Sequence, residues 1–507
     1  MTHAADVLIL GGGVAGCVLA ARLSADPARH VTLVEAGPDY GASPYGWPGS
    51  LIDAARLPRD HFWERSVPLP RFRGRVLGGS SAVNGGWHTW GSAADHRTWQ
   101  ALAGDAFASS TLGPFRDAAI TAMGLTAVPD ADITVWGKSA LAGAGRLGYD
   151  LVDMAAPGPP GCGTPLVNVT DGTRRNVALS YLTAEVRTRS NLTIVAHALV
   201  DRLLVTGDRA TGARVITATG PHELTAAEVV LSAGALGSPL ILQRSGVGDP
   251  DRLRTVGVDP LINLPGVGSN LSDQPGVFVP LQSSAALDVE LTEHEAAAPL
   301  YSTRVLVRVA STHAPPDGWD LHLLPVAGRP LFGNLPVGRY EAGISAQLMS
   351  PRSRGAVHIS ATEPSAVPQI DPAFLSDLDG VDLAVLREGL ALACELAQTP
   401  DLRHRWTGSL NGLHHSDSEL RASLSCYWHP VGTCAAGTND RPEAVVDPEL
   451  RVRGLANVRV VDASVLPSAP AANTQLTVLA LAEWAADLLA SGLSSELLPN
   501  APRKAQS

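Results

Sequence analysis

The chain has 507 residues and a formal net charge of −11, with 45% apolar and 17% charged residues. This balance indicates a globular protein with an extensive core, and an acidic excess without any Lys/Arg cluster argues against a nucleic-acid partner. No apolar run reaches the roughly 18–20 residues that a bilayer span requires, and the five cysteines are scattered without a C-x-x-C pair. Neither a transmembrane segment nor a disulfide or metal site is therefore expected.

The first stretch with a clear structural pattern is residues 6–16. A short apolar run rich in branched residues, residues 6–10, predicts a buried parallel strand. Gly11, Gly13 and Gly16 follow in the pattern G-x-G-x-x-G, and residues 17–23 continue as a helix former. The first glycine allows a sharp turn, the second lets backbone N–H groups approach a pyrophosphate, and the third lets the helix pack closely on the sheet. The pyrophosphate would lie at the helix N-terminus.

A second branched segment, residues 30–34, predicts the neighbouring parallel strand. Glu35 directly follows it, 19 residues after Gly16. A carboxylate at this place can accept hydrogen bonds from both hydroxyls of an adenosine ribose. The pattern predicts a Rossmann-type dinucleotide-binding unit and does not by itself distinguish NAD from FAD.

The next part of the chain is less regular. Residues 42–70 are rich in Pro, Gly and aromatic residues, whereas residues 74–86 are mostly small, as expected where backbone passes close to a large ligand. Residues 95–147 have helical composition, and the Pro/Gly-rich residues 156–165 predict a loop. Strands are expected at 192–196, 199–205, 213–218 and 228–232, the last entering a small-residue turn and a helix at 233–242.

The second half contains a region of different character. Between residues 276 and 426, strand-like segments at 303–309 and 356–360 alternate with loops before a helical stretch at 383–398. This alternation indicates a substrate lobe set on a mixed or antiparallel sheet. A strand at 458–461 then ends at Asp462, and a long apolar helix at about 476–489 follows.

Five motifs, in this order, resemble those of the glucose–methanol–choline (GMC) flavin oxidoreductases, and the resemblance extends over residues 6–489. The motifs are residues 11–16 with Glu35, residues 73–85, residues 232–248, residues 264–273, and the catalytic end formed by residues 429–434 and 461–467. The resemblance implies an α/β fold of two lobes, with a Rossmann-type FAD-binding domain and a substrate-binding domain on a mixed or antiparallel sheet. Residues 1–155, 191–275 and 427–507 would form the FAD-binding domain, residues 276–426 the substrate-binding domain, and residues 156–190 an excursion toward it.

The resemblance implies FAD as the cofactor. Some members attach it covalently to a histidine just before the asparagine of the second motif, but Val83 stands there, so FAD is expected to bind non-covalently. Gln274 replaces the histidine that many members have after Asp273. The residues expected to contact FAD are Gly11, Gly13, Val14, Ala15, Gly16, Glu35, Ala36, Arg75, Val76, Gly79, Ser80, Asn84, Gly85, Gly86, Trp87, Val200, Ala233, Gly234, Trp428, Asp462, Ala463, Asn473 and Thr474.

The chemistry is expected at the other end of the chain. Alcohol oxidation removes a proton from oxygen and a hydride from the adjacent carbon, and flavin N5 can accept the hydride. By resemblance, His429 takes the place of the catalytic histidine and Asn473 that of the second polar residue. Histidine suits the role of base, whereas an amide can only orient the hydroxyl. Capping of the following helix is a competing or additional role for Asn473.

The leading interpretation is FAD-dependent oxidation of a primary alcohol to the aldehyde. Trp428 before the histidine favours an aromatic or heteroaromatic alcohol, by similarity to the aryl- and furfuryl-alcohol members. The alternative is a dehydrogenase that reduces a carrier instead of O2, as the mycofactocin-associated members do, which residues 84–86 resemble. A remoter alternative is a flavin-dependent lyase like some hydroxynitrile lyases, or a non-redox binding protein. The expected partners are a small alcohol and O2 or an electron carrier, and the expected location is the cytoplasm.

Overall fold

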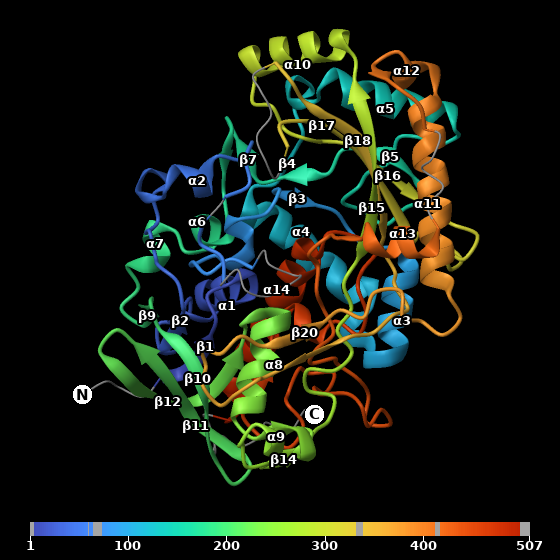
Figure 1. Ribbon diagram of the computed structural model, residues 1–507. Helices are drawn as coiled ribbons and strands as arrows, with labels where there is room; N and C mark the ends of the chain where they lie inside the picture. The colour runs from blue at the N-terminus through green and yellow to red at the C-terminus, as the bar shows by residue number, and fades with distance from the viewer. Residues whose placement is uncertain (1–4, 59, 64–72, 331–337, 411–415, 497–507) are drawn as a thin grey trace, which may run out of the picture.

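Two sheets organise the molecule. The computed structural model describes residues 5–58, 60–63, 73–330, 338–410 and 416–496. Figure 1 shows a mainly parallel sheet at the lower left, around the label β1, and an antiparallel sheet at the upper right, around β15 and β18. The long helix α14 lies in the middle of this view.

The parallel sheet is assembled from segments far apart in the chain. Its strands are β1 (Ala5–Leu10), β2 (Val31–Val34), β9 (Leu192–Val195), β12 (Gly220–Leu231) and β23 (Val458–Val460), in the order β23-β12-β1-β2-β9. Leu10 pairs with Val34 on one side and with Leu231 on the other, and Leu231 pairs with Val460. These strands therefore end at the same level. Their apolar runs are buried, as expected for a parallel sheet covered on both faces.

The first half of β12 belongs to a different arrangement. It pairs antiparallel with β11 (Arg209–Thr217), which pairs with β10 (Leu199–Thr206). β12 thus joins an antiparallel meander to the parallel core. The four strands expected between residues 191 and 235 are confirmed, although the third and fourth are longer than expected.

Helices cover the parallel sheet. α1 (Val14–Leu23) packs against β1, β2 and α14 (Thr474–Glu496), and α14 also packs against α4 (Ser109–Met123). α8 (Gly234–Arg244) packs against β10. A Cβ added to Gly16 would lie 1.9 Å from the carbonyl oxygen of Gly11, so only glycine allows this approach of α1 to the end of β1.

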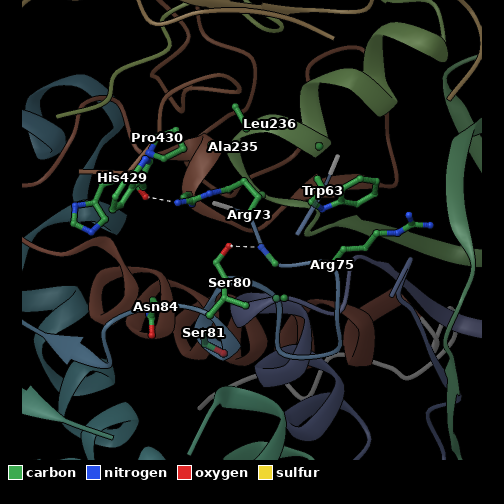
Figure 2. A pocket seen from close by; sticks show the side chains of 18 of the residues that line it. Trp63, Arg73, Arg75, Ser80, Ser81, Asn84, Ala235, Leu236, His429 and Pro430 are labelled. Atoms are coloured by element: carbon green, nitrogen blue, oxygen red, sulfur yellow. Dashed lines mark hydrogen bonds between the residues drawn. The ribbon is translucent and has the colours of Figure 1, made fainter. Parts of the chain in front are cut away.

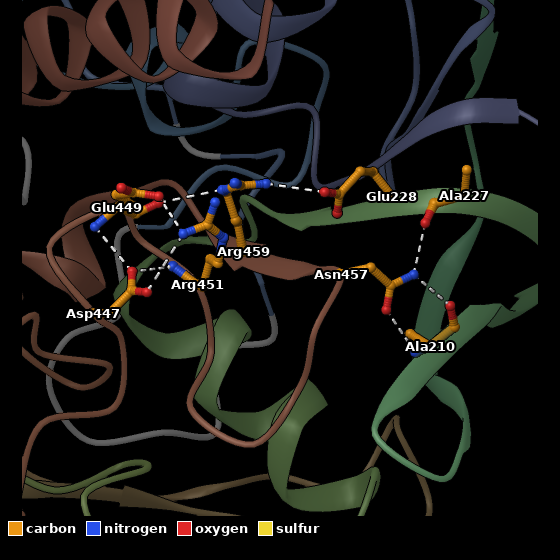
Figure 3. A network of polar contacts seen from close by, with 8 residues as sticks. All are labelled: Ala210, Ala227, Glu228, Asp447, Glu449, Arg451, Asn457 and Arg459. Atoms are coloured by element: carbon orange, nitrogen blue, oxygen red, sulfur yellow. Dashed lines mark hydrogen bonds and ion pairs between the residues drawn. The ribbon is translucent and has the colours of Figure 1, made fainter. Parts of the chain in front are cut away.

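Polar side chains attach the C-terminal strand to the rest of the parallel sheet (Figure 3). Asn457 Nδ2 donates to the carbonyls of Ala210 (2.8 Å) and Ala227 (2.6 Å), and its Oδ1 accepts from the Ala210 amide. Arg459 Nη1 donates to Glu228 Oε1 at 3.0 Å in a buried ion pair. These bonds hold β23 in register beside β12.

The antiparallel sheet has the order β21-β15-β18-β17-β16-β5, with β22 also on β15. Its strands are β15 (Pro275–Ser283), β18 (Glu341–Leu348), β17 (Leu321–Gly328), β16 (Leu306–Val309), β5 (Gly161–Gly163), β21 (Trp406–Thr407) and β22 (Ser425–Cys426). α11 (Val381–Gln398) and α5 (Val135–Arg146) pack against it. Side chains alternate along each strand: Val277, Val279 and Leu281 enter the core with α11, whereas Phe278 between them lines a cavity.

Shorter elements complete the described chain. They are α2 (Gly49–Ile52), β3 (Trp87–His88), α3 (Ala93–Ala103), β4 (Thr126–Ala127), β6 (Leu166–Val167), β7 (Val169–Thr170), β8 (Thr173–Arg174), α6 (Val177–Tyr181), α7 (Ala184–Arg187), β13 (Val247–Gly248), α9 (Pro250–Thr255), β14 (Ile262–Asn263), α10 (Ala285–Ala297), β19 (Ala356–His358), β20 (Gln369–Asp371), α12 (Pro400–Arg403) and α13 (Asp417–Ala422), with 3-10 turns at Pro44–Gly46, Gly79–Ala82, Asp105–Phe107, Asp130–Asp132 and Ala463–Val465. None of the described helices combines the length and apolar character that a membrane crossing requires.

Two expectations differ from the structure. The loop expected at 156–165 is wrong in part, because β5 lies within it and pairs with β16 through Cys162 and Val307. Its flanking glycines indicate a turn, but pairing with a strand more than 140 residues away overrides that local signal. α5, inside the first segment assigned to the FAD-binding domain, packs instead into the core of the antiparallel sheet through Trp136 and Ala140.

We expect Gly16→Ala to lower the free energy of unfolding by about 1–3 kcal/mol, because its methyl group overpacks the junction of α1 and β1. The midpoint of thermal unfolding measures this. Gly145→Ala is the matched control: Gly145 is exposed in α5 and no atom lies within 4 Å of its added Cβ. It should leave the midpoint unchanged or slightly raised, since alanine favours helix. A Gly16→Ala protein as stable as the control would contradict this role.

Candidate active site

One cavity of about 820 Å³ is lined by residues from the carboxyl ends of the parallel strands and from the antiparallel sheet. This volume lies toward the upper end of the range for small-molecule sites. Most of the residues expected at the site line it: Gly11, Gly13, Val14, Ala15, Glu35, Ala36, Arg75, Gly79, Ser80, Asn84, Gly85, Trp87, Val200, Ala233, Gly234, Trp428, His429, Asp462, Ala463, Asn473 and Thr474. The structure thus brings together residues up to 463 positions apart in sequence.

Three of the expected contact residues do not line the cavity. Gly16 faces the end of β1, and Val76 is fully buried in the core of the parallel lobe. A Cβ on Gly86 would lie 2.6 Å from Asn168 Oδ1, so this glycine packs against the chain that follows β6. Each of these three residues belongs to a motif whose other members line the cavity. Its own role is to pack against the surrounding chain.

The first end of the cavity is formed by the turn between β1 and α1. Gly11 has φ +117°, and a Cβ there would lie 2.5 Å from the carbonyl oxygen of Ser232. Gly13 is the N-cap of α1 and has no side-chain cap, so the first N–H groups of the helix remain available beside the cavity. This arrangement favours an anionic group at the helix N-terminus.

Glu35 stands beside this turn and is only 7% exposed. Its Oε2 accepts from the Gly12 amide at 2.9 Å, and its Oε1 accepts from the Gly37 amide at 2.7 Å. Burial raises the pKa of this carboxyl to about 7, against the lowering effect of these amides. Each carboxylate oxygen retains capacity for another donor, as a ribose diol would supply.

Asp462 joins the end of β23 to the start of α8. Its Oδ2 accepts from the Gly234 amide (2.8 Å) and the Ser238 hydroxyl (2.5 Å), while its Oδ1 accepts from the Ser464 amide. Burial raises its pKa. Through these bonds Asp462 holds the backbone of residues 233–234 and Ala463 at the cavity wall.

The middle of the cavity is crossed by Arg73 (Figure 2). Its Nη2 donates to the carbonyl of Trp428, so the second motif is tied to the segment that precedes His429. Ser80 Oγ accepts from the Gly74 amide at 3.2 Å and braces the turn that carries Arg73. Trp428 has φ +61°, an uncommon conformation for a bulky residue, and these contacts help to maintain it.

His429 lies at the far end. Its amide donates to Asp273 Oδ1 at 2.8 Å, and its Nδ1 lies 2.7 Å from Gln274 Oε1. The Gln274 Nε2 group donates to two carbonyls, of Met349 (2.9 Å) and Pro470 (2.7 Å). Because both donors of the amide are engaged by carbonyls, Oε1 must face the imidazole and accept a hydrogen from Nδ1. This assigns the tautomer of His429 with an unprotonated Nε2.

Asn473 faces that nitrogen. Its Nδ2 lies 3.4 Å from His429 Nε2 and 3.3 Å from the hydroxyl of Tyr427. Its Oδ1 accepts from the Thr89 hydroxyl, which in turn accepts from the Asn473 amide. The side chain is therefore anchored by Thr89, and its amide group is presented to His429 and the cavity.

Burial controls the protonation of His429 and of its neighbour Tyr427. Removal from water, together with the cation of Arg73, lowers the pKa of His429 to about 3. Burial raises the pKa of Tyr427, whose ring centroid lies 4.4 Å from that of His429, to about 12. At neutral pH the site thus holds a neutral imidazole and a protonated phenol.

The cavity fits the flavin nucleotide that the sequence motifs imply. Gln475 is 7% exposed, its Oε1 accepts from Asn84 Nδ2, and its Nε2 has no acceptor among the described residues. Flavin carbonyl oxygens would supply such an acceptor. Val83 lines the same wall and offers no nucleophile for a covalent bond. Within the described part of the chain, no three His, Cys, Asp or Glu side chains form a group that could hold a metal ion.

Several residues of the site escape sequence reasoning. Gln274, Tyr427 and Thr89 contact the His429–Asn473 pair, but none of them stood out by residue type or spacing. Gln274 was noted only as a departure from the family pattern, and it lies behind His429 rather than on the cavity wall. Arg73 is the first residue of the second motif, and that motif was the signal by which its place in the site could have been predicted.

Comparison with known proteins agrees with this arrangement. Family models described as GMC oxidoreductase match residues 5–276 and 351–482. A 5-(hydroxymethyl)furfural oxidase of Methylovorus sp. is 32% identical over 538 residues, covering 96% of this chain and 98% of that protein. The mitochondrial choline dehydrogenase of Homo sapiens is 31% identical over 538 residues, covering 95% of this chain and 89% of that protein. Among solved structures, pyridoxine 4-oxidase from Mesorbium loti is similar with a TM-score of 0.82 and 27% identity, covering 96% and 99% of the two chains.

The two family models cover most of the chain, and the relatives match nearly its whole length. The expected α/β fold with an FAD-binding lobe is confirmed by the sheets and by the structural match. The chain therefore belongs to the GMC oxidoreductase family, as an FAD-dependent enzyme that oxidises alcohols at their CH–OH group.

Proposed function

We propose that the protein oxidises a primary, heteroaromatic or aromatic alcohol to the aldehyde, with O2 as the acceptor of the electrons. The observation that carries the proposal is the hydrogen bond between His429 Nδ1 and Gln274, which leaves Nε2 free to accept a proton. The relatives support the substrate class, since two of them are named for furfuryl and pyridine alcohols and both are named oxidases.

The proton path begins at the substrate hydroxyl. Asn473 Nδ2 donates to the alcohol oxygen and orients it, while His429 Nε2 takes the proton. An imidazole with a pKa of about 3 is a weak base toward a resting alcohol. The proton therefore leaves as the hydride leaves the carbon, because a protonated aldehyde is a far stronger acid than an alcohol. When bound, FAD supplies the hydride acceptor.

The cofactor is held by the cavity-lining residues of the first, second and last motifs. Gly11, Gly13 and the start of α1 would take the pyrophosphate, and Glu35 the ribose. Gln475 and Asn84 would take the flavin ring. We assign residues 1–155 without α5, residues 191–275 and residues 427–507 to the FAD-binding domain, and residues 276–426 together with α5 and β5 to the substrate domain. Within residues 156–190, α6 packs against α1 and stays with the FAD-binding domain.

The cavity wall near His429 suits a flat ring. Phe278 on β15, Tyr427 and Trp428 line it together with Trp87. Leu324 on β17 also lines the cavity and belongs to the small cluster against which Trp87 and Tyr427 pack. Flat aromatic surfaces favour a planar substrate through offset stacking.

Anaerobic mixing of the FAD-loaded enzyme with a panel of alcohols tests the reaction. Benzyl, furfuryl and pyridylmethyl alcohols should bleach the oxidised flavin band, and admission of air should restore it within the turnover time. Slow restoration by air with rapid restoration by an artificial dye would favour a carrier-linked dehydrogenase. Failure of every alcohol to bleach the band would favour a lyase or a binding protein.

We expect His429→Ala to slow anaerobic flavin reduction by about 10²-fold or more, since the proton acceptor is lost. Stopped-flow absorbance measures the rate constant, and the ratio of absorbance at the flavin band to that at 280 nm verifies that FAD is retained. His404→Ala, which replaces an exposed histidine whose Nδ1 bonds to the Pro400 carbonyl, is the control and should keep the wild-type rate. Normal reduction in His429→Ala would refute the assignment.

The pH dependence of flavin reduction tests whether Gln274 acts on His429. Because the pKa of His429 lies at about 3, the wild-type reduction rate should stay constant from pH 8 to 5 instead of falling near 6.5. In Gln274→Glu, a carboxylate beside Nδ1 raises the pKa of His429, so the rate should begin to fall at a higher pH than in the wild type. Gln274→Met should slow reduction about tenfold or more at every pH, since a buried hydrogen bond is lost. Identical pH profiles for the wild type and Gln274→Glu would show that Gln274 does not act on His429.

A further inference from the structure

Arg304 is a buried cation on the cavity wall that the proposed reaction does not use. It lies just before β16, is 3% exposed and lines the same cavity as His429. Its Nη1 donates weakly to the Gly85 carbonyl at 3.4 Å. Its Nε and Nη2 have no acceptor among the described residues, and Asp132, the carboxylate whose charge reaches Arg304, forms no ion pair with it. A buried charge without a partner is costly, so such a group indicates a missing ligand.

The free atoms form one edge of the guanidinium. The same chain shows what this edge binds when it is satisfied: Arg22 donates from Nε and Nη2 to the two oxygens of Glu483, at 2.7 and 2.8 Å. Parallel N–H groups of this kind match a carboxylate with two hydrogen bonds. Arg304 presents the same pair of N–H groups, Nε and Nη2, without an acceptor among the described residues.

Two other buried arginines show that this is a special case. Arg174 uses its two terminal nitrogens on the carbonyls of Leu51, Ala82 and Arg56. Arg308 uses both of its terminal nitrogens on carbonyls that include those of Trp90 and Met154. Each thereby ties loops together. In Arg304, which lines the cavity, one terminal nitrogen and the adjoining Nε are buried and have no acceptor among the described residues.

The guanidinium is held in place without using that edge. Its carbon lies 3.5 Å from the centroid of the Tyr301 ring, and this cation–π contact fixes the plane of the guanidinium. Trp87 packs both against the cluster that contains Tyr301 and against the cluster that Tyr427 joins. One aromatic side chain thus connects the Arg304 site with the neighbour of His429.

We propose that the substrate alcohol carries a carboxylate, which binds the Nε/Nη2 edge of Arg304 while its hydroxymethyl group lies at His429 and Asn473. This proposal rests on the proposed alcohol oxidation and names its substrate class. A carboxylate carries one negative charge and matches the one unpaired guanidinium edge of Arg304. Trp87, which packs toward both sites, offers an aromatic surface for the ring that separates the two groups. A phosphate monoester shares the hydrogen-bonding chemistry but carries a second negative charge, which one guanidinium edge leaves unmatched.

The test compares two benzyl alcohols that differ only at the para position, where one carries a carboxylate and the other an uncharged methyl group. Anaerobic flavin reduction is measured with 4-(hydroxymethyl)benzoate and with 4-methylbenzyl alcohol, giving a limiting rate constant and a dissociation constant for each. The wild type should bind the carboxylate at least about tenfold more tightly at a similar limiting rate. Arg304→Gln should abolish this preference by weakening carboxylate binding alone, and Arg304→Lys should retain part of it. Arg146→Gln, which removes a cation from an exposed ion pair with Asp401, should change neither constant.

The outcomes separate the two proposals. If neither alcohol bleaches the flavin, nor any other in the panel, the proposed function fails. If both reduce the flavin and Arg304→Gln leaves their ratio unchanged, alcohol oxidation stands and the carboxylate site is overturned. Tighter binding of 4-(hydroxymethyl)phenyl phosphate than of the benzoate would overturn the choice of carboxylate. Should Arg304→Gln fail to fold, benzoate binding to the wild-type holoenzyme decides: benzoate should perturb the flavin spectrum and compete with substrate, and benzamide should not.

Discussion

The site depends on one constraint, the common level at which the parallel strands end. Leu10, Val34, Leu231 and Val460 lie side by side in register, although they come from the beginning, the middle and the end of the chain. The residues that follow these strands therefore emerge at one edge, where Gly11, Glu35, Ser232 and Asp462 form the wall of a single cavity. A shift of any of these strands by one residue would turn its side chains to the other face and separate this set.

The opposite wall follows a different principle. The antiparallel sheet turns one set of alternating side chains toward α11 and the other toward the cavity, so the same strands provide both a core and a substrate surface. Burial then shapes the chemistry at the junction of the two walls. It keeps His429 neutral and Tyr427 protonated, and it leaves Gln274 as the partner that selects which imidazole nitrogen carries the hydrogen.

The nucleotide half of the site was predictable because its residues lie close together in sequence, at a characteristic spacing. Glycines at fixed spacing, a branched strand before them and an acid after the next strand need no knowledge of distant contacts, and Gly11, Gly13 and Glu35 lie on the cavity wall as expected. His429 and Asn473 were found through resemblance, and they face each other at 3.4 Å. The roles of Gln274, noted only as a departure from the family pattern, and of Arg304 could not be predicted, since they lie in contacts made or missing across 155 and more than 200 residues. β5 was missed for the same reason, because its glycines indicate a turn until β16 is present to pair with it.

The position of β23 in the parallel sheet has a consequence for biosynthesis. While the chain is being made, β1, β2, β9 and β12 can associate long before residues 458–460 leave the ribosome. Until then the sheet has an open edge beside β12, and the nascent cavity lacks its wall of residues 428–475. Closure around the nucleotide is therefore a late event, completed only when Asn457 and Arg459 attach the last strand. A chain truncated before β23 would expose this edge to pairing with another molecule, a route to aggregation rather than to a smaller enzyme.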